Sequence, residues 1–276
     1  MDLILRHETP ADYYAVEELT REAFWTLYWG SEPKICDEHL LVSRLRQCAA
    51  FVPELNYVAE ADSKVVGHII YSKSKVVDES GDEHETLTFG PLSTLPEYQG
   101  KGIGKALMLH TFHVAREMGF RAVIIFGHPD FYPRVGFRRA SEFGITDNEG
   151  KSYDPLMALP LYDGALTGIR GRYSIDPVYE SLNQKDTLEF DKKFPPKEIH
   201  KPILIDVLLN RLEPVPRNAI KGLDFQSLTQ IQTKSEDELS ALDGINADAI
   251  NIIRTVMGAY GLRWGVSIKT DSPRNG

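Results

Sequence analysis

The feature that most constrains the fold of this chain is a glycine-rich segment between two stretches of different periodicity. Residues 87–95 before it are rich in β-branched and apolar side chains and end at Pro96, which predicts a strand. Residues 106–118 after it carry apolar side chains at spacings of three and four and stop at Gly119, which predicts a helix. A glycine-rich turn at such a junction directs backbone N–H groups and the positive end of the helix dipole at one place, so it suits a phosphate. The segment reads Tyr98-Gln99-Gly100-Lys101-Gly102-Ile103-Gly104-Lys105-Ala106.

Two common phosphate-binding motifs do not fit this segment. The chain contains no Gly-x-x-x-x-Gly-Lys followed by Ser or Thr, so the segment is not a P-loop. Lys105 occupies the position of the third glycine of a dinucleotide-binding fingerprint, which argues against a nicotinamide site. A glycine-rich turn without a ligand stays open as the structural alternative.

Two motifs together carry a resemblance to a known family. The segment follows the pattern Gln-x-x-Gly-x-Gly-Lys-Ala at the head of a helix. Residues 121–127 are an apolar run of the length of a buried strand, and residues 132–137 then read Tyr-x-x-x-Gly-Phe. In this order the two motifs resemble the GNAT N-acetyltransferases. The residues Phe89-Gly90-Pro91-Leu92 add a resemblance to the YhbS-like branch of that family.

The resemblance implies a fold, a co-substrate and a set of site residues. The expected fold is α/β (α+β), a mixed sheet that is splayed at its centre and flanked by helices, with acetyl-CoA in the splay. Tyr132 matches the tyrosine that protonates the departing CoA thiolate, and a phenol of pKa about 10 is a suitable donor to a thiolate of pKa about 8.5. A ring that only packs on the pantetheine arm is the alternative. The expected cofactor-binding residues are Leu92, Ser93 and Thr94 for the pantetheine arm and Gln99, Gly100, Lys101, Gly102, Ile103, Gly104 and Lys105 for the pyrophosphate.

The two lysines of that set, Lys101 and Lys105, are expected to supply charge to the pyrophosphate, or else to be solvated residues at the start of the helix. The sequence does not assign the general base that an amine acceptor requires. The strand before the glycine-rich segment offers only Glu85, which is expected to lie too far from the splay. His128 and Asp130 follow the buried strand and serve either as bases or as caps of the short helix at residue 132. A water chain to solvent is the third possibility.

Residues after the first helix lie beside the cleft in GNAT folds, so they are expected to influence the choice of acceptor. Trp25, Tyr28 and Trp29 either enclose an acceptor, including a cation, or pack in the core. No feature of the sequence names the acceptor.

Composition and charge argue against several classes of protein. The formal net charge of −9 argues against a surface built for nucleic acid or for an anionic membrane. Cys36 and Cys48 have no spacing suited to a metal site or a disulfide framework, so we expect no metal and a cytoplasmic location. Residues 1–7 are too short and too charged for a signal peptide, and no run of about 18 apolar residues predicts a membrane span.

The patterns along the chain predict three parts. Residues 1–172 are expected to form the acetyltransferase domain, residues 173–205 a linker or an extended arm over it, and residues 206–270 a helical domain. Gly67 marks a bulge or a close approach between elements. Expected strands are residues 3–6, 56–61, 65–77, 87–95 and 121–127, with a hairpin tip at 78–85. Expected helices are residues 12–24, 37–47, 106–118, 218–223, 227–231, 236–242 and 247–253.

The C-terminal part carries a second resemblance. Residues 217–265 resemble the C-terminal domain of the RNA polymerase α subunit, with a helix-hairpin-helix turn at residues 243–246. Such a turn holds DNA through backbone amides and a nearby basic residue. Here Asn246, Ala247 and Asp248 stand at those positions, so nucleic-acid binding is disfavoured. The expected roles are protein docking, dimerisation or simple stabilisation.

The sequence therefore predicts an acetyl-CoA-dependent N-acetyltransferase that moves the acetyl group directly to a primary amine of an unidentified acceptor. Two alternatives stay open. One is a non-catalytic acyl-CoA sensor that signals through the helical tail. The other is a transcription-associated factor whose tail directs the acetyltransferase.

Overall fold

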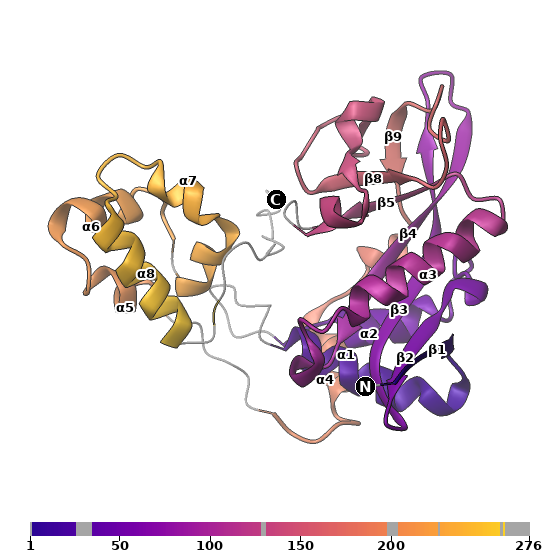
Figure 1. Ribbon diagram of the computed structural model, residues 1–276, viewed down its shortest axis with the longest axis horizontal. Helices are drawn as coiled ribbons and strands as arrows, with labels where there is room; N and C mark the ends of the chain where they lie inside the picture. Colours follow the sequence, from indigo (N-terminus) through magenta and orange to yellow (C-terminus); the bar gives the residue numbers. More distant parts are fainter. Residues whose placement is uncertain are drawn as a thin grey trace. The chain divides into compact units, whose positions relative to one another are not determined.

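The computed structural model describes residues 2–25, 35–127, 131–197, 204–225, 227–259 and 262. These residues form two compact units. The first comprises residues 2–25 and 36–195, and the second comprises residue 35, residues 196–197 and the described residues from 204 onward. The first unit is a mixed sheet covered by helices on both faces, which confirms the predicted fold class (Figure 1).

The sheet of the first unit has the strand order β1-β2-β3-β4-β5-β8-β6, with β9 pairing to both β3 and β7. Neighbouring strands are antiparallel except for the pairs β4–β5 and β7–β9. The strands are β1 Leu3–His7, β2 Tyr57–Ala61, β3 Lys64–Val77, β4 Glu83–Thr94, β5 Ala122–Phe126, β6 Arg138–Arg139, β7 Ile145–Thr146, β8 Leu156–Pro160 and β9 Gly171–Ser174.

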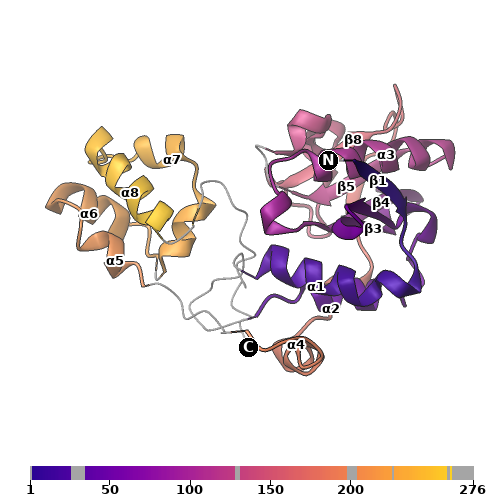
Figure 2. The same cartoon turned by 60° about the horizontal axis from the view of Figure 1, so that its bottom comes forward.

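Helices cover the two faces of this sheet differently. One face carries α1 (Tyr13–Phe24), α2 (Glu38–Leu45) and α4 (Gln184–Asp191), and the other carries α3 (Ile103–Glu117) (Figure 2). Alternate residues of the strands pack on opposite faces, as the two-residue period of a strand requires. Short 3₁₀ helices complete the unit: η1 Pro10–Asp12, η2 Pro53–Leu55, η3 Pro96–Tyr98, η4 Tyr132–Val135, η5 Ala140–Phe143 and η6 Pro177–Tyr179.

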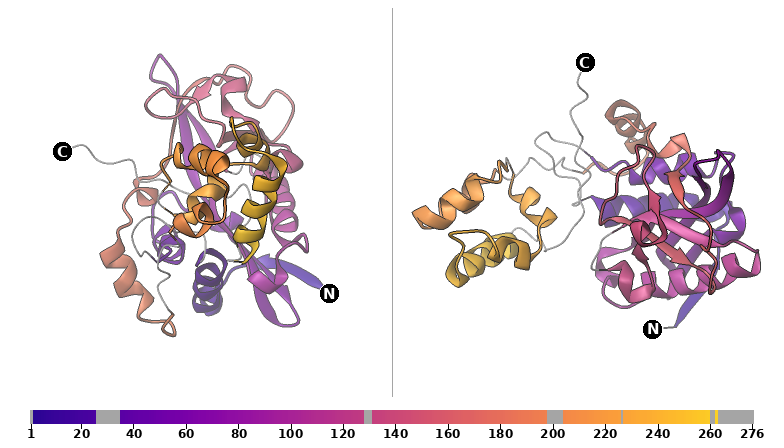
Figure 3. Two further views of the ribbon diagram at one scale, coloured as in Figure 1. Left: turned by 90° about the vertical axis from the view of Figure 1, so that its left-hand side faces the viewer. Right: turned by 90° about the horizontal axis from the view of Figure 1, so that it is seen from above.

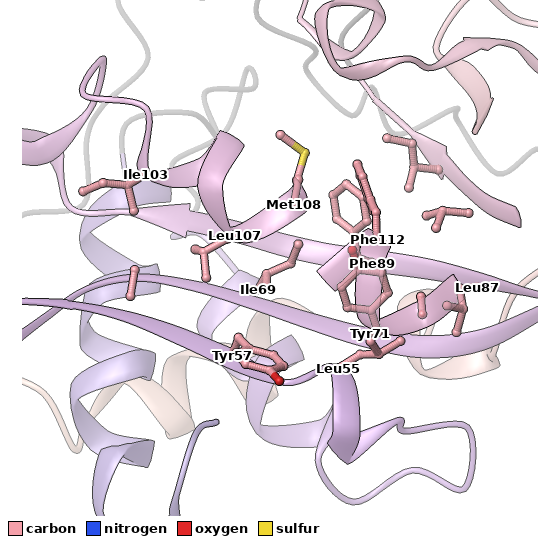
Figure 4. Packing of buried hydrophobic residues seen from close by; sticks show 14 of the residues in the cluster. Leu55, Tyr57, Ile69, Tyr71, Leu87, Phe89, Ile103, Leu107, Met108 and Phe112 are labelled. Carbon is pink, nitrogen blue, oxygen red and sulfur yellow. The ribbon is translucent and has the colours of Figure 1, made fainter. Parts of the chain in front are cut away.

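The larger core lies between α3 and the sheet. Phe89 of β4 and Phe112 of α3 point toward one another there, with Leu107 and Ile69 nearby (Figure 4). Burial of this face holds α3 in place, because apolar area removed from water stabilises a fold by roughly 25 cal/mol per Å². The helix and strand predicted on either side of the glycine-rich segment are thus confirmed as α3 and β4, which meet at that segment.

The centre of the sheet is open between β4 and β5. The two strands pair in parallel at a single position, Leu87 with Val123. Beyond it β4 continues to Thr94 with β3 as its only strand partner among the described residues. The register of β4 against β3 shifts by one residue between the pairs Ile69–Leu92 and Tyr71–Phe89, so β4 carries a bulge at residues 90–91. The backbone edge of residues 89–94 therefore faces the opening toward β5.

Gly67 brings α3 close to the sheet. A Cβ at this position would lie 2.6 Å from Ile103 Cγ2, so only glycine lets the first turn of α3 lie against β3. The register between β2 and β3 also shifts beside this residue, between Ala59 and Glu60. Both features predicted for Gly67, a bulge and a close approach, are confirmed, and both lie next to the glycine-rich segment.

Residues 173–195, for which the sequence suggested a linker or an arm, belong to the first unit. Tyr179 of η6 shares a hydrogen bond of 2.9 Å with Ser72 of β3. The helix α4 packs on α2, where Arg44 forms an ion pair with Asp186. This segment therefore lies over the outer side of α1 and α2.

The second unit is helical, and Figure 3 shows its helices from two directions. Gly244 has φ +88°, and Asn246 caps the following helix by accepting a hydrogen bond of 2.8 Å from the N–H of Ala249. None of the helices in the described part of the chain is long and apolar enough to cross a membrane. The helices are α5 Asp206–Leu209, α6 Pro214–Lys221, η7 Leu228–Thr233, α7 Glu236–Ser240 and α8 Ala247–Ala259.

Candidate functional site

The glycine-rich loop ends at the N-terminus of α3. Gly100 has φ +75° and Gly102, the N-cap of α3, has φ +83°. A Cβ at either position would meet no atom within 4 Å, so the positive φ, and not crowding, selects glycine at both positions. The first intrahelical bond runs from the N–H of Ala106 to the carbonyl of Gly102. The N–H groups of residues 103–105 are therefore left for an anion at the positive end of the helix dipole.

Two contacts join this loop to the open edge of β4. Gln99 Nε2 donates a hydrogen bond of 3.2 Å to the carbonyl of Thr94. A Cβ at Gly104 would make an ordinary contact of 3.5 Å with the side chain of Leu92. Packing therefore does not demand glycine at position 104. The loop and the open edge nevertheless form one continuous surface.

The side chains of the predicted loop residues do not all reach that surface. Ile103 is buried in the core, so only its backbone is available. The Lys101 ammonium lies 4.6 Å from the centre of the Tyr98 ring, a cation–π distance. Lys105 is exposed on the first turn of α3.

The side chain of Ser93 is turned away from the opening. Its hydroxyl shares a hydrogen bond of 3.0 Å with the hydroxyl of Thr20 on α1, and both residues are fully buried. Leu92 points to the α3 side and Ser93 to the α1 side, because side chains alternate along a strand. The peptide groups between them are left at the edge that faces β5.

Tyr132 of η4 lies against both sides of the opening. Its ring centre is 5.9 Å from that of Phe89 on β4. A Cβ at Gly127, directly after β5, would lie 2.4 Å from the Tyr132 ring, so glycine leaves the space that this ring occupies. The Tyr132 hydroxyl makes no hydrogen bond to any residue in the described ranges. Burial, and secondarily the charge of Glu38, raises the pKa of Tyr132 to about 12, so the phenol stays neutral at physiological pH.

The structure also locates the other candidates. Glu85 is more than half exposed and forms an ion pair of 2.9 Å with Lys73, so it lies away from the opening as expected. Trp25 is buried, and the Arg21 guanidinium lies 4.5 Å from its ring centre, which favours packing in the core. Four further candidates lie outside the described residues: Tyr28, Trp29, His128 and Asp130.

A buried cluster that the sequence did not predict joins α1, α2 and α4. Arg21, 1% exposed, contacts both carboxylate oxygens of Asp191, at 2.6 and 2.9 Å. His39 Nε2 lies 3.1 Å from the same carboxylate, and His39 Nδ1 lies 3.7 Å from Cys36 Sγ. Burial raises the pKa of the Cys36 thiol, which makes it unreactive. Because Thr20 beside Arg21 contacts Ser93, this cluster holds α1 against the open edge of β4.

We expect Asp191→Asn to destabilise the fold by about 3 kcal/mol, since it leaves a buried guanidinium without its counter-charge. Burial opposes ionisation of Asp191, but His39 and Arg21 outweigh it and lower the pKa of this carboxyl. The stabilisation is therefore complete above the ordinary carboxyl pKa of about 4 and is lost as the pH falls through the lower, folded value. Urea unfolding of wild type and variant at pH 7 and pH 3 measures both effects.

Asp186→Asn is the matched control, because Asp186 lies on the same helix but forms an exposed ion pair with Arg44. It should leave stability nearly unchanged. Equal destabilisation by the two substitutions, or a loss that is the same at both pH values, would contradict the role assigned to Asp191.

The first unit is similar in sequence to a known family of proteins. Residues 21–137 match the model of the Acetyltransferase (GNAT) family. The uncharacterized N-acetyltransferase YjhQ of Escherichia coli K12 is 35% identical over 97 residues, which are 35% of this chain and about half (53%) of that protein. The uncharacterized N-acetyltransferase YhbS of the same organism is 27% identical over 170 residues, which are 61% of this chain and 93% of YhbS.

Two solved structures show the same fold. Escherichia coli YhbS in complex with CoA superposes with a TM-score of 0.57 at 23% identity, covering 66% of this chain and 94% of that one. A GNAT acetyltransferase from Brucella melitensis in complex with acetyl-CoA has a TM-score of 0.51 at 25% identity, covering 64% of this chain and 98% of that one. The first unit therefore has the GNAT fold, with a YhbS-like relative and structural neighbour.

Proposed function

We propose that the first unit, with its GNAT fold, is an acetyl-CoA-dependent N-acetyltransferase that moves the acetyl group directly to a primary amine. One observation carries the proposal: the loop at the start of α3, the open edge of β4 and the Tyr132 ring all border the same opening in the sheet. The names of the two relatives and the CoA ligands of the two neighbouring structures support it.

The donor is expected to lie along β4. Backbone groups of Leu92, Ser93 and Thr94 offer a strand edge to the amides of the pantetheine arm. The N–H groups of residues 103–105 face the pyrophosphate, and the positive φ of Gly100 and Gly102 shapes the loop around it. The full set of proposed donor-binding residues is Leu92, Ser93, Thr94, Gln99, Gly100, Lys101, Gly102, Ile103, Gly104 and Lys105.

The chemistry follows from this placement. The amine nitrogen attacks the thioester carbon, so that a C–N bond forms and the C–S bond breaks, and holding the two reactants together supplies much of the acceleration. A backbone N–H of the open edge is placed to stabilise the oxyanion. Tyr132 donates its phenolic proton to the departing thiolate. Burial raises the pKa of Tyr132 to about 12, so the phenol carries the proton that this role requires.

Two experiments test the proposal. The first is thermal unfolding with acetyl-CoA, CoA or NADPH, and the second is a screen of amines for release of the CoA thiol. At one hundred times their dissociation constant, acetyl-CoA and CoA should each stabilise the protein by about 2.7 kcal/mol, and NADPH should not. At least one primary amine should accelerate thiol release. Stabilisation without amine-dependent release would favour the acyl-CoA sensor instead, and no stabilisation would exclude both.

We further propose that residues 1–172 carry this activity, that residues 173–205 form an arm, and that residues 206–270 are a helix-hairpin-helix-like module for protein contacts or dimerisation. The capped turn at residues 243–246 supports the last assignment. Asp243 and Asp248 lie at that turn, and their charge disfavours a DNA phosphate there.

A further inference from the structure

Phe126 is an exposed residue at the end of an otherwise buried strand. The four residues before it in β5 are buried, whereas Phe126 is 56% exposed. Val123 and Ile125 belong to the core on the α3 face. Because side chains alternate along a strand, Phe126 lies on the opposite face, where its ring centre is 6.1 Å from that of Tyr173. A single exposed apolar residue is ordinary in a soluble protein, so its place in the fold decides whether it has a role.

Phe126 borders the opening between β4 and β5. Gly127, the next residue, leaves the space that the Tyr132 ring occupies. Counted three residues on from the one parallel pair of these strands, the β4 position across from Phe126 is Gly90. A Cβ at Gly90 would meet no atom within 4 Å. At this position, therefore, no side chain of β4 stands between the two strands.

The two faces of the opening differ in what covers them. On the α3 face, the rings of Tyr132 and Phe89 pack together in the core beneath the helix. The donor is proposed to lie along the edge of β4, with its pyrophosphate at the start of α3. The amine is therefore expected to approach from the face opposite α3. On that path the group attached to its nitrogen passes the Phe126 ring.

The surroundings of the Phe126 ring are apolar. Its antiparallel partner on β8 is Leu156, which is buried in the cluster that also contains Ile124 and Tyr173. The Tyr173 hydroxyl donates a hydrogen bond of 2.8 Å to the carbonyl of Ile124, so its polar end is already satisfied. These neighbours favour an apolar substituent over a charged one, because a charge loses water there without gaining a partner.

We propose that Phe126 selects the acceptor, and that the acceptor amine carries an apolar group next to its nitrogen that packs on the Phe126 ring. The inference rests on the proposed function and specifies the substrate class of the same site. It adds no bond to the transfer: the C–N bond still forms as the C–S bond breaks. Contact with one apolar side chain discriminates between substrates by about tenfold to a hundredfold.

The test compares benzylamine with ethanolamine, two primary amines of nearly equal basicity that differ in polarity. Thiol release gives kcat/KM for each amine in the wild type, Phe126→Ala and Phe126→Leu. The wild type should prefer benzylamine about tenfold or more, and Phe126→Ala should lower this preference about tenfold through a lower kcat/KM for benzylamine. Phe126→Leu, which keeps an apolar side chain, should retain part of the preference.

Leu109→Ala is the matched control, because Leu109 is an apolar residue of α3 that is 49% exposed. It should keep the wild-type preference, and the stabilisation by acetyl-CoA should be unchanged in every variant. A wild type without a preference for benzylamine, an unchanged preference in Phe126→Ala or an equal loss with both amines would overturn the inference while the proposed function stands. A wild type that releases thiol with no primary amine would overturn both.

Discussion

We expect Gly102→Glu to remove most of the stabilisation of this protein by acetyl-CoA. The position has φ +83°, so any side chain costs about 1–2 kcal/mol in the backbone alone. The larger effect is electrostatic, because a carboxylate then stands where the helix N-terminus attracts an anion. If the dissociation constant rises a hundredfold, a ligand stabilisation of about 2.7 kcal/mol falls to about 0.4 kcal/mol. Thermal unfolding with and without acetyl-CoA measures this difference.

Gly81→Glu is the matched control for that experiment. Gly81 lies in the turn between β3 and β4 and has φ +88°, and a Cβ there, as at Gly102, would meet no atom within 4 Å. Gly81→Glu therefore carries the same backbone cost and the same added charge away from the loop. It should lower the melting temperature of the free protein but keep the full shift with acetyl-CoA. A shift that survives in Gly102→Glu, or is lost in both variants, would show that the loop does not hold the donor.

If Tyr132 is the general acid, we expect Tyr132→Phe to lower the rate of acetyl transfer by about 10²–10⁴, the usual contribution of a positioned general acid. Stability and acetyl-CoA binding should be unchanged, because the Tyr132 hydroxyl makes no hydrogen bond to a described residue and phenylalanine keeps the ring contacts with Phe89 and Phe137. Thiol release with the best amine of the screen measures the rate. The wild-type rate should not fall through ionisation of this phenol until the pH approaches its pKa of about 12.

Tyr179→Phe is the matched control for this experiment, because it should lower stability and leave the rate unchanged. Tyr179 is a half-buried tyrosine whose hydroxyl shares a hydrogen bond of 2.9 Å with that of Ser72. Its loss should cost about 1 kcal/mol of stability and leave the rate unchanged. A Tyr132→Phe variant with wild-type activity would support the alternative in which the Tyr132 ring only packs against the donor.

Much of the fold was predictable because its signals are local. The strand at residues 87–95 and the helix at 106–118 correspond to β4 (Glu83–Thr94) and α3 (Ile103–Glu117). Side-chain periodicity and the glycines between them are enough to predict both elements and their junction. The short helix at Tyr132 was predicted from the family resemblance, and the close approach at Gly67 from a glycine inside a strand pattern.

Only the tertiary structure decided which distant residues come together around the opening between β4 and β5. Arg21 and Asp191 are 170 positions apart, and no periodicity links them. The opening itself depends on β4 and β5 pairing only at Leu87 and Val123. By itself the sequence determined β4, α3 and the glycine-rich loop between them, because these depend on neighbours along the chain. It suggested only a linker or an arm where α4 lies. Only the folded chain decided the opening and its buried charges, because these depend on contacts between distant segments.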